Sequence, residues 1–102
     1  MIKEIFSGKL PSVLNSPTPI ALEFGAEGSP DSKRLHSIVE QVADTLQGKV
    51  EVYYVNVDKV PEIKELYKVK DLPTMIIFKD GDPQDTMVGY HSEQEVHNFL
   101  IQ

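Results

Sequence analysis

The sequence contains no cysteine among its 102 residues. A chain without thiols forms no disulfide of its own, offers no thiolate nucleophile and builds no metal site from cysteine ligands. It also lacks a long apolar stretch, so we expect neither a signal peptide nor a membrane span, and we expect a cytoplasmic protein with no membrane partner.

A surplus of basic residues is also missing. The chain has 10 lysines and arginines against 16 acidic residues, which gives a net charge of −6. Because phosphate binding needs clustered positive charge, we expect no nucleic-acid partner. Hydrophobic residues make up 40% of the sequence, as in ordinary globular proteins, and the sequence shows no repeat or linker. We therefore expect a single domain over residues 1–102.

Apolar periodicity predicts alternating strands and helices. The clearest helix follows from apolar residues spaced between Leu35 and Leu46, with Gly48 as its stop, and the clearest strand is VEVYYVNV at residues 50–57. Ser92 and Glu95 predict a capping box before the last helix. In chain order, we expect a short strand over 3–6, a weak helix over 10–14, a strand over 20–24, a helix over 30–47, a strand over 50–57, a helix over 60–67, strands over 74–78 and 86–90, and a final helix over 93–100.

This order is βαβαββα, with a possible βα unit in front. The helix between the first two strands predicts that these strands are parallel, whereas the hairpin at residues 79–82 predicts an antiparallel final pair. The fold class is therefore α/β, with a central mixed β-sheet flanked by helices.

The segment Ser29-Pro30-Asp31-Ser32 lies where a strand gives way to a helix. Serine is a favoured N-cap, proline suits the first helical turn, and the positive end of the helix dipole stabilises an aspartate. From the residues alone, the segment is a helix cap.

Three longer stretches, taken together and in order, resemble the thioredoxin family: LEFGAEGSPDSK (22–33), VNVDKVPEIKELYKVKDLPTMIIFKDGD (55–82) and MVGY (87–90). The resemblance covers residues 18–101 and implies a thioredoxin-like fold. The family exchanges thiols and disulfides with protein substrates. The resemblance therefore implies a protein or peptide partner, no cofactor, no metal and a monomer.

The resemblance also assigns site residues. Ser29 and Ser32 stand at the positions of the nucleophilic and resolving cysteines, with Glu23 as the buried acid. The residues implied to face a substrate are Gly28, Pro30, Asp31, Leu72, Pro73 and Gly89, and Pro73 is expected to follow a cis bond that exposes the backbone of Leu72 to an extended peptide.

Several positions depart from the family pattern. Gly25 and Gly28 stand where tryptophans usually flank the site, Ser37 replaces a helix-kinking proline, and Tyr54 replaces a lysine that often pairs with the buried acid. Without that lysine we expect burial to raise the pKa of Glu23.

Three interpretations remain open. The chain is a cysteine-to-serine version of a thiol–disulfide oxidoreductase, or a naturally thiol-free module that binds a partner through a groove at Ser29 and Pro73, or a structural subunit with no functional groove. The pair of one-atom replacements favours the first, while the missing tryptophans favour the second. Serine lacks the redox-active sulfur, so the chain as written cannot perform the exchange.

Other chemistries fit less well. His36 lies seven residues after Ser29 on the same predicted helix, about 10 Å along its axis, which is too far for a serine–histidine pair. The spacing of His36, His91 and His97 is not that of metal ligands. We interpret the three histidines as surface or helix-face residues.

Overall fold

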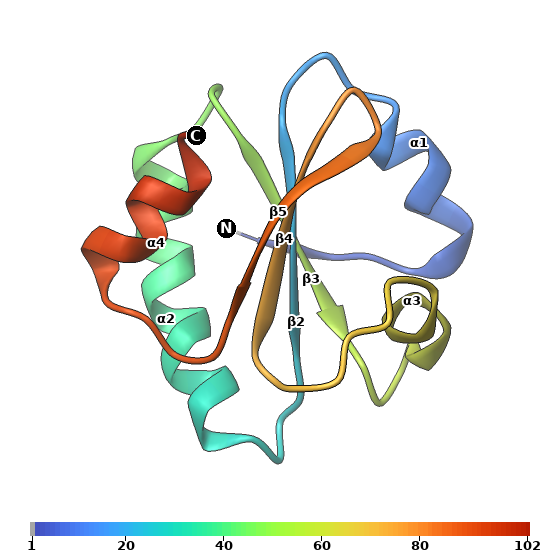
Figure 1. The fold of residues 1–102 in the computed structure, drawn as a ribbon, viewed down its shortest axis with the longest axis vertical. Helices are drawn as coiled ribbons and strands as arrows, with labels where there is room; N and C mark the ends of the chain where they lie inside the picture. Colours follow the sequence, from blue (N-terminus) through green and yellow to red (C-terminus); the bar gives the residue numbers. More distant parts are fainter. Residues whose placement is uncertain (1) are drawn as a thin grey trace.

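The computed structural model describes residues 2–102, which form a five-stranded sheet in the order β1-β3-β2-β4-β5, with helices on both faces (Figure 1). The elements are β1 (Lys3–Glu4), the 3-10 helix η1 (Ser7–Lys9), α1 (Leu10–Leu14), β2 (Ile20–Gly25), α2 (Pro30–Thr45), β3 (Glu51–Asn56), α3 (Pro61–Leu66), β4 (Thr74–Lys79), β5 (Asp82–Val88) and α4 (Glu93–Leu100). The predicted α/β class, the element order and the short N-terminal strand and helix are confirmed.

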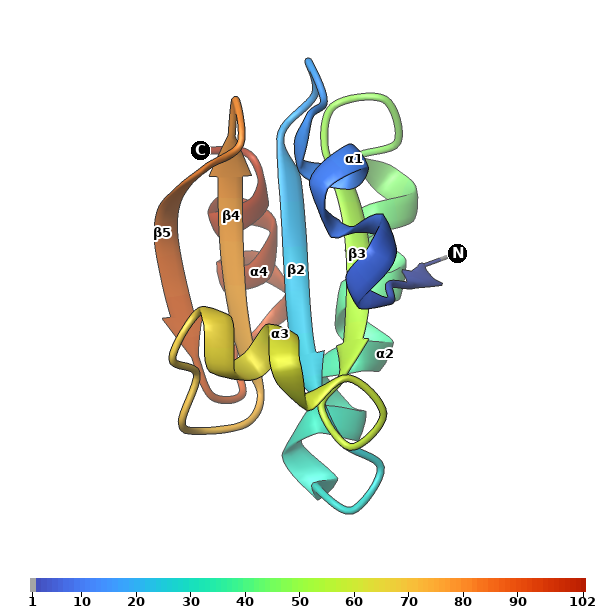
Figure 2. The same ribbon diagram turned by 90° about the vertical axis from the view of Figure 1, so that its right-hand side faces the viewer.

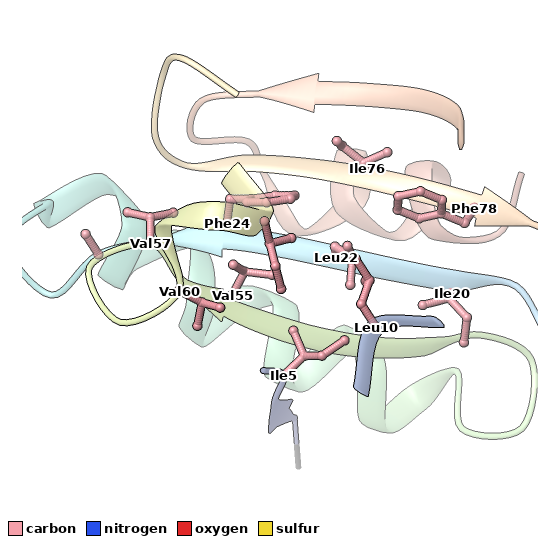
Figure 3. Close-up of a cluster of buried hydrophobic side chains, with 12 residues drawn as sticks. Ile5, Leu10, Ile20, Leu22, Phe24, Val55, Val57, Val60, Ile76 and Phe78 are labelled. Carbon is pink, nitrogen blue, oxygen red and sulfur yellow. The ribbon is translucent and has the colours of Figure 1, made fainter. Parts of the chain in front are cut away.

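The sheet separates two apolar layers. Helices α2 and α4 cover one face, and α1 and α3 cover the other (Figures 1 and 2). Because side chains alternate along a strand, Leu22 and Phe24 of β2 pack into the layer of α1 and α3, whereas Ala21 packs under α2 and α4. Figure 3 shows the first of these clusters. All six residues of β2 are buried, so this strand is the centre of the core.

Strand directions agree with the prediction. β2 and β3 are parallel, and β4 and β5 are antiparallel. β2 also pairs with β4 in the antiparallel direction, so the N-terminal end of β4 lies beside the C-terminal end of β2. No helix among residues 2–102 is both long and apolar enough to cross a membrane.

Some predicted boundaries were wrong. β5 begins at Asp82 and ends at Val88, whereas the pattern predicted a strand over 86–90. Asp80 and Gly81 both have positive φ, 53° and 82°, and form a two-residue turn that lets pairing resume at once. Pro83 is tolerated because β5 is an edge strand, where a proline removes no hydrogen bond needed by a neighbour. The α2 helix ends at Thr45 and β3 spans Glu51–Asn56, so both are shorter than predicted.

One edge of the sheet gathers the predicted site. Phe24 pairs with Thr74, and Thr74 pairs with Val88. The residues just beyond this row are Gly25, Pro73 and Gly89, one from each of three adjacent strand ends. The chain enters α2 from the same edge (Figure 2). Residues from three distant parts of the sequence therefore meet at the start of α2.

Candidate functional site

Ser29 caps α2. Its backbone is extended, and its Oγ accepts a hydrogen bond of 3.2 Å from the backbone N–H of Ser32. Pro30 occupies the first turn, and Asp31 lies in that turn, where the helix dipole favours a carboxylate. The predicted cap is confirmed. Ser29 is half-buried, while Gly28, Pro30 and Asp31 are exposed.

The Leu72–Pro73 peptide bond is cis, as predicted. Pro73 is buried and Leu72 is half-buried. The carbonyl of Pro73 accepts a 2.7 Å hydrogen bond from the backbone N–H of Gly89. Gly89 has a φ of 89°, a conformation that L side chains rarely adopt, so glycine suits this position. The two segments are thus joined at the sheet edge next to β2.

A cation–aromatic contact joins helix α2 to the segment that follows β5 at this edge of the sheet. The Arg34 guanidinium lies 4.1 Å from the centre of the Tyr90 ring, and Nη1 of the same guanidinium lies 3.5 Å from Oδ1 of Asp31. Arg34 is on the exposed side of α2, and Tyr90 directly follows Gly89. The contact therefore connects the first turns of α2 to the segment after β5.

Ser32 is almost fully buried, and its Oγ has no hydrogen-bond partner among the described residues. A Cβ added to Gly25 would lie 3.2 Å from the Cβ of Ser32, so the Ser32 side chain packs close to the backbone of Gly25. The same added atom would lie 2.9 Å from the Tyr54 hydroxyl oxygen and 3.0 Å from a carbon of its ring. Tyr54 thus occupies the space that a side chain at position 25 would need.

Glu23 is completely buried and lies two residues before Gly25 on the same strand face, toward α2. Nδ1 of His36 lies 3.0 Å from both carboxyl oxygens of Glu23. Nε2 of His36 lies 3.4 Å from Oε1 of Glu40, one helical turn further along α2. The His36 ring also contacts the Tyr54 ring, with a centroid separation of 4.8 Å.

Burial raises the pKa of the Glu23 carboxyl, and the hydrogen bond from His36 only partly opposes this effect. The predicted burial and the predicted direction of the shift are both confirmed. The pKa of His36 is raised as well, chiefly because the imidazolium is hydrogen-bonded to Glu23. Burial, together with the nearby Glu23 charge, raises the pKa of Tyr54 to about 12, so Tyr54 stays neutral beside the pair.

His36 is the residue whose role the sequence did not reveal. Its place on a helix face was expected, but its partner Glu23 is 13 positions away in the chain. The available signal was that His36 lies four residues after Ser32 and therefore on the same side of α2. Both imidazole nitrogens face carboxylates, so neither is directed at a serine hydroxyl. This arrangement does not support a serine hydrolase.

A cleft of about 260 Å³ lies beside these groups. It is lined by Ile2, Glu4, Ala26, Glu27, Ser32, Lys33, His36 and Tyr54. The buried hydroxyl of Ser32 and the imidazole of His36 therefore border one solvent-connected space. Within residues 2–102, no group of three or more histidine, aspartate or glutamate side chains is arranged to hold a metal ion.

Comparison with known proteins places the chain in a family. The thioredoxin family model matches residues 5–102, nearly the whole chain. The chain belongs to the thioredoxin family. It is 36% identical over 88 residues to the thioredoxin of Rickettsia bellii, covering 86% of this chain and 84% of that protein. It is 33% identical over 94 residues to chloroplastic thioredoxin M4 of Arabidopsis thaliana, covering 88% of this chain and 49% of that protein. It is also 32% identical over 77 residues to thioredoxin 1 of a Nostoc species, covering 76% of this chain and 72% of that protein.

Membership of the thioredoxin family supports thiol–disulfide exchange as the role of the family and proteins as the class of partner. The match includes every predicted site residue, from Glu23 to Gly89. The family alone does not decide what this cysteine-free chain does with that site.

Proposed function

We propose that this chain is a redox-silent thioredoxin-family domain in which Ser29 and Ser32 occupy the positions of the two exchange cysteines. The observation that carries the proposal is the placement of these serines. Ser29 caps α2 at the end of the buried strand β2, and Ser32 lies buried one turn further on. Replacing sulfur with oxygen keeps the size and hydrogen bonding of the side chains but removes the exchange chemistry.

The surrounding parts of an exchange site support this proposal. The helix N-terminus lowers the pKa of a thiol placed there, because its free amides and dipole stabilise a thiolate. The cis Leu72–Pro73 segment lies at the same sheet edge, next to the end of β2. Glu23 supplies a buried carboxyl on the strand face below α2. We infer that these parts remain usable if sulfur is returned.

The restored reaction can be written in full for Ser29→Cys combined with Ser32→Cys. The thiolate at position 29 attacks a substrate disulfide, one substrate thiolate leaves, and a mixed disulfide forms. The thiol at position 32 then loses its proton, attacks the sulfur at position 29 and releases the second substrate thiolate. Two substrate sulfurs are reduced, and the two introduced sulfurs are joined in a disulfide. Dithiothreitol reopens that disulfide and closes the cycle.

The first test is reduction of a protein disulfide with dithiothreitol as the reductant. We expect the double variant to exceed the background rate set by the reductant alone, whereas the chain as written stays at background. In a parallel reaction without dithiothreitol, pre-reduced Ser29→Cys alone should accumulate mixed disulfides that mass spectrometry detects, because neither a second thiol of the chain nor a small reductant releases them. Ser32→Cys alone should stay at background because that side chain is buried. A double variant that folds but stays at background contradicts the proposal.

A second candidate is a natural, thiol-free module that binds an extended protein segment at Ser29 and the Leu72–Pro73 edge. The close packing of Tyr54 against Gly25 favours this candidate. It shows that the chain departs from the family's thiol–disulfide exchange site at further positions besides the two serines. Serine codons at positions 29 and 32 of the natural gene would support this candidate, and cysteine codons would remove it. Chemical-shift changes at the Ser29 and Leu72 amides on addition of extended peptides would test the binding directly.

A further inference from the structure

Three side chains form a continuous line from the core to the surface. Glu23 is 0% exposed, the His36 side chain is 34% exposed and the Glu40 side chain is 44% exposed. The contacts between them measure 3.0 Å and 3.4 Å, and each joins a different nitrogen of the imidazole to a carboxylate. A histidine held between a buried and an exposed carboxylate has the geometry of a proton carrier.

We propose that Glu23, His36 and Glu40 form a proton relay that connects the buried space near Ser32 with solvent, and that His36 is its central positioning residue. The part of this proposal that concerns a thiol at position 32 rests on the proposed function. The part that concerns Glu23 and His36 belongs to the chain as written.

The proton balance of the relay is simple. A group at position 32 gives its proton to the Glu23 carboxylate. One Glu23 oxygen takes that proton, while the other oxygen keeps its hydrogen bond from Nδ1–H of the His36 imidazolium. Nε2–H of the same ring then releases its proton toward Glu40 and water, which leaves a neutral imidazole. The net charge of the Glu23–His36 pair does not change, because the pair holds one titratable proton before the transfer, on His36, and one after it, on Glu23. The negative charge left at position 32 departs with the substrate thiolate when the new disulfide forms. The raised pKa values of both residues agree with a proton held in common.

The neighbours of Glu23 on the sheet carry no charge, and apart from Glu40 the charged groups near the pair lie along the adjoining cleft. On the sheet, Glu23 pairs with Tyr54 of β3 and with the apolar Met75 of β4. Tyr54 is neutral, as its raised pKa requires. The other charged groups at the adjoining cleft are Glu4 of β1, Glu27 of the loop before α2 and Lys33 of α2. Glu4 also contacts Lys59, at 3.8 Å. The imidazole is thus the cation that directly contacts Glu23.

The first experiment uses the cysteine-free chain and follows His36, His91 and the Glu23 carboxyl carbon by NMR as the pH changes. We expect Glu23 and His36 to report the same titration steps, because they share a proton. Glu23→Gln should move the His36 midpoint down by about one unit or more, and Glu40→Gln should move it down by less. His91, which contacts Glu95 at the surface, serves as the internal control and should not move. A His36 midpoint unchanged by Glu23→Gln overturns the relay.

The second experiment asks whether the relay sets the pH dependence of exchange. In the Ser29→Cys, Ser32→Cys background, His36→Gln keeps an N–H donor for Glu23 but cannot carry a proton. The midpoint of the pH–rate profile should rise by about one unit or more, because Glu23 without the imidazolium stays protonated to higher pH. His91→Gln in the same background should leave the profile unchanged.

The two failures can be told apart. A dithiol background that folds but reduces no disulfide overturns the proposed function, while the NMR titration still decides the relay. An active dithiol whose pH profile is unchanged by His36→Gln overturns the relay, while the proposed function stands. Circular dichroism of each variant confirms that it is folded before either result is interpreted.

Discussion

Gly25 and Tyr54 show how one pair of residues shapes the site. A Cβ at position 25 would lie 2.9 Å from the Tyr54 hydroxyl oxygen and 3.0 Å from a carbon of its ring, closer than side chains normally pack. Gly28, in contrast, has no heavy atom within 4 Å of an added Cβ. The surroundings of the two glycines therefore differ, although both residues stand where the family usually has tryptophan. At Gly25 the space is filled from β3, and at Gly28 the space is open.

We predict that Gly25→Ala lowers the free energy of unfolding by about 1–3 kcal/mol, because the new methyl group overpacks the contact with Tyr54. Urea unfolding followed by circular dichroism measures the change. Gly28→Ala is the matched control and should cost less than about 0.5 kcal/mol. In a Tyr54→Val background, Gly25→Ala should cost less than in the parent, since the obstructing ring is gone. Equal costs in the two backgrounds would show that Tyr54 is not the obstacle.

At the scale of elements, α2 carries most of the site. Its N-cap, its buried Ser32 and its relay residue His36 lie within the first two turns. The helix keeps its position because Leu35, Val39 and Val42 pack against the sheet. The N-terminal end of α2 is held by the Ser29 cap, by Pro30 in the first turn and by the turn bond from the Ser29 N–H to the Ala26 carbonyl, at 3.1 Å.

We predict that Ser29→Ala destabilises the domain by about 1 kcal/mol, because the Ser32 N–H loses its capping oxygen. Ser29→Asp is the matched control, since aspartate is an equally favoured cap and adds a charge that the helix dipole stabilises. Thermal and urea unfolding of the three chains measure the effect. If the alanine and aspartate variants unfold at the same urea concentration, capping at this position contributes nothing measurable.

At the scale of the whole molecule, the fold buries an ionisable group at its centre. Glu23 lies on the fully buried strand β2, and desolvation disfavours its charged form. The pKa values of Glu23 and His36 are both raised on folding, from the ordinary 4.5 and 6.5. The native state therefore holds these protons more tightly than the unfolded state does. The stability they contribute is fully present below the unfolded pKa values and is lost as the pH rises through the folded ones.

We predict that the free energy of unfolding of the parent chain, relative to that of Glu23→Gln, falls as the pH rises above the ordinary glutamate value of 4.5 and through the raised folded pKa values of Glu23 and His36. For each proton that the native state holds in excess, the slopes should differ by up to about 1.4 kcal/mol per pH unit. Glu23→Gln should accordingly become the more stable chain at and above neutral pH. Urea unfolding at a series of pH values makes the measurement. Parallel pH profiles for the two chains would contradict the prediction.

Much of the fold could be predicted from local pattern. The period of apolar residues along α2, the β-branched run of β3 and the cap residues Ser29 and Ser92 indicate structure through interactions within a turn or between adjacent residues. The stretches shared with the thioredoxin family added the cis bond at Leu72–Pro73. Boundaries were less well predicted, as at β5, because strand length on a sheet edge depends on the partner strand.

Only the tertiary structure decided which side chains meet. The sequence places Glu23 in an apolar strand and has Tyr54 where the family often has a lysine. It therefore predicts a buried acid without a charged partner. The packing of α2 over β2 brings His36 to Glu23 and gives that acid a partner. It also places Tyr54 in the space beside Gly25. Periodicity reports which face of an element is apolar, but a contact between residues 23 and 36 depends on how the helix lies across the sheet. That position is set by the packing of the entire core.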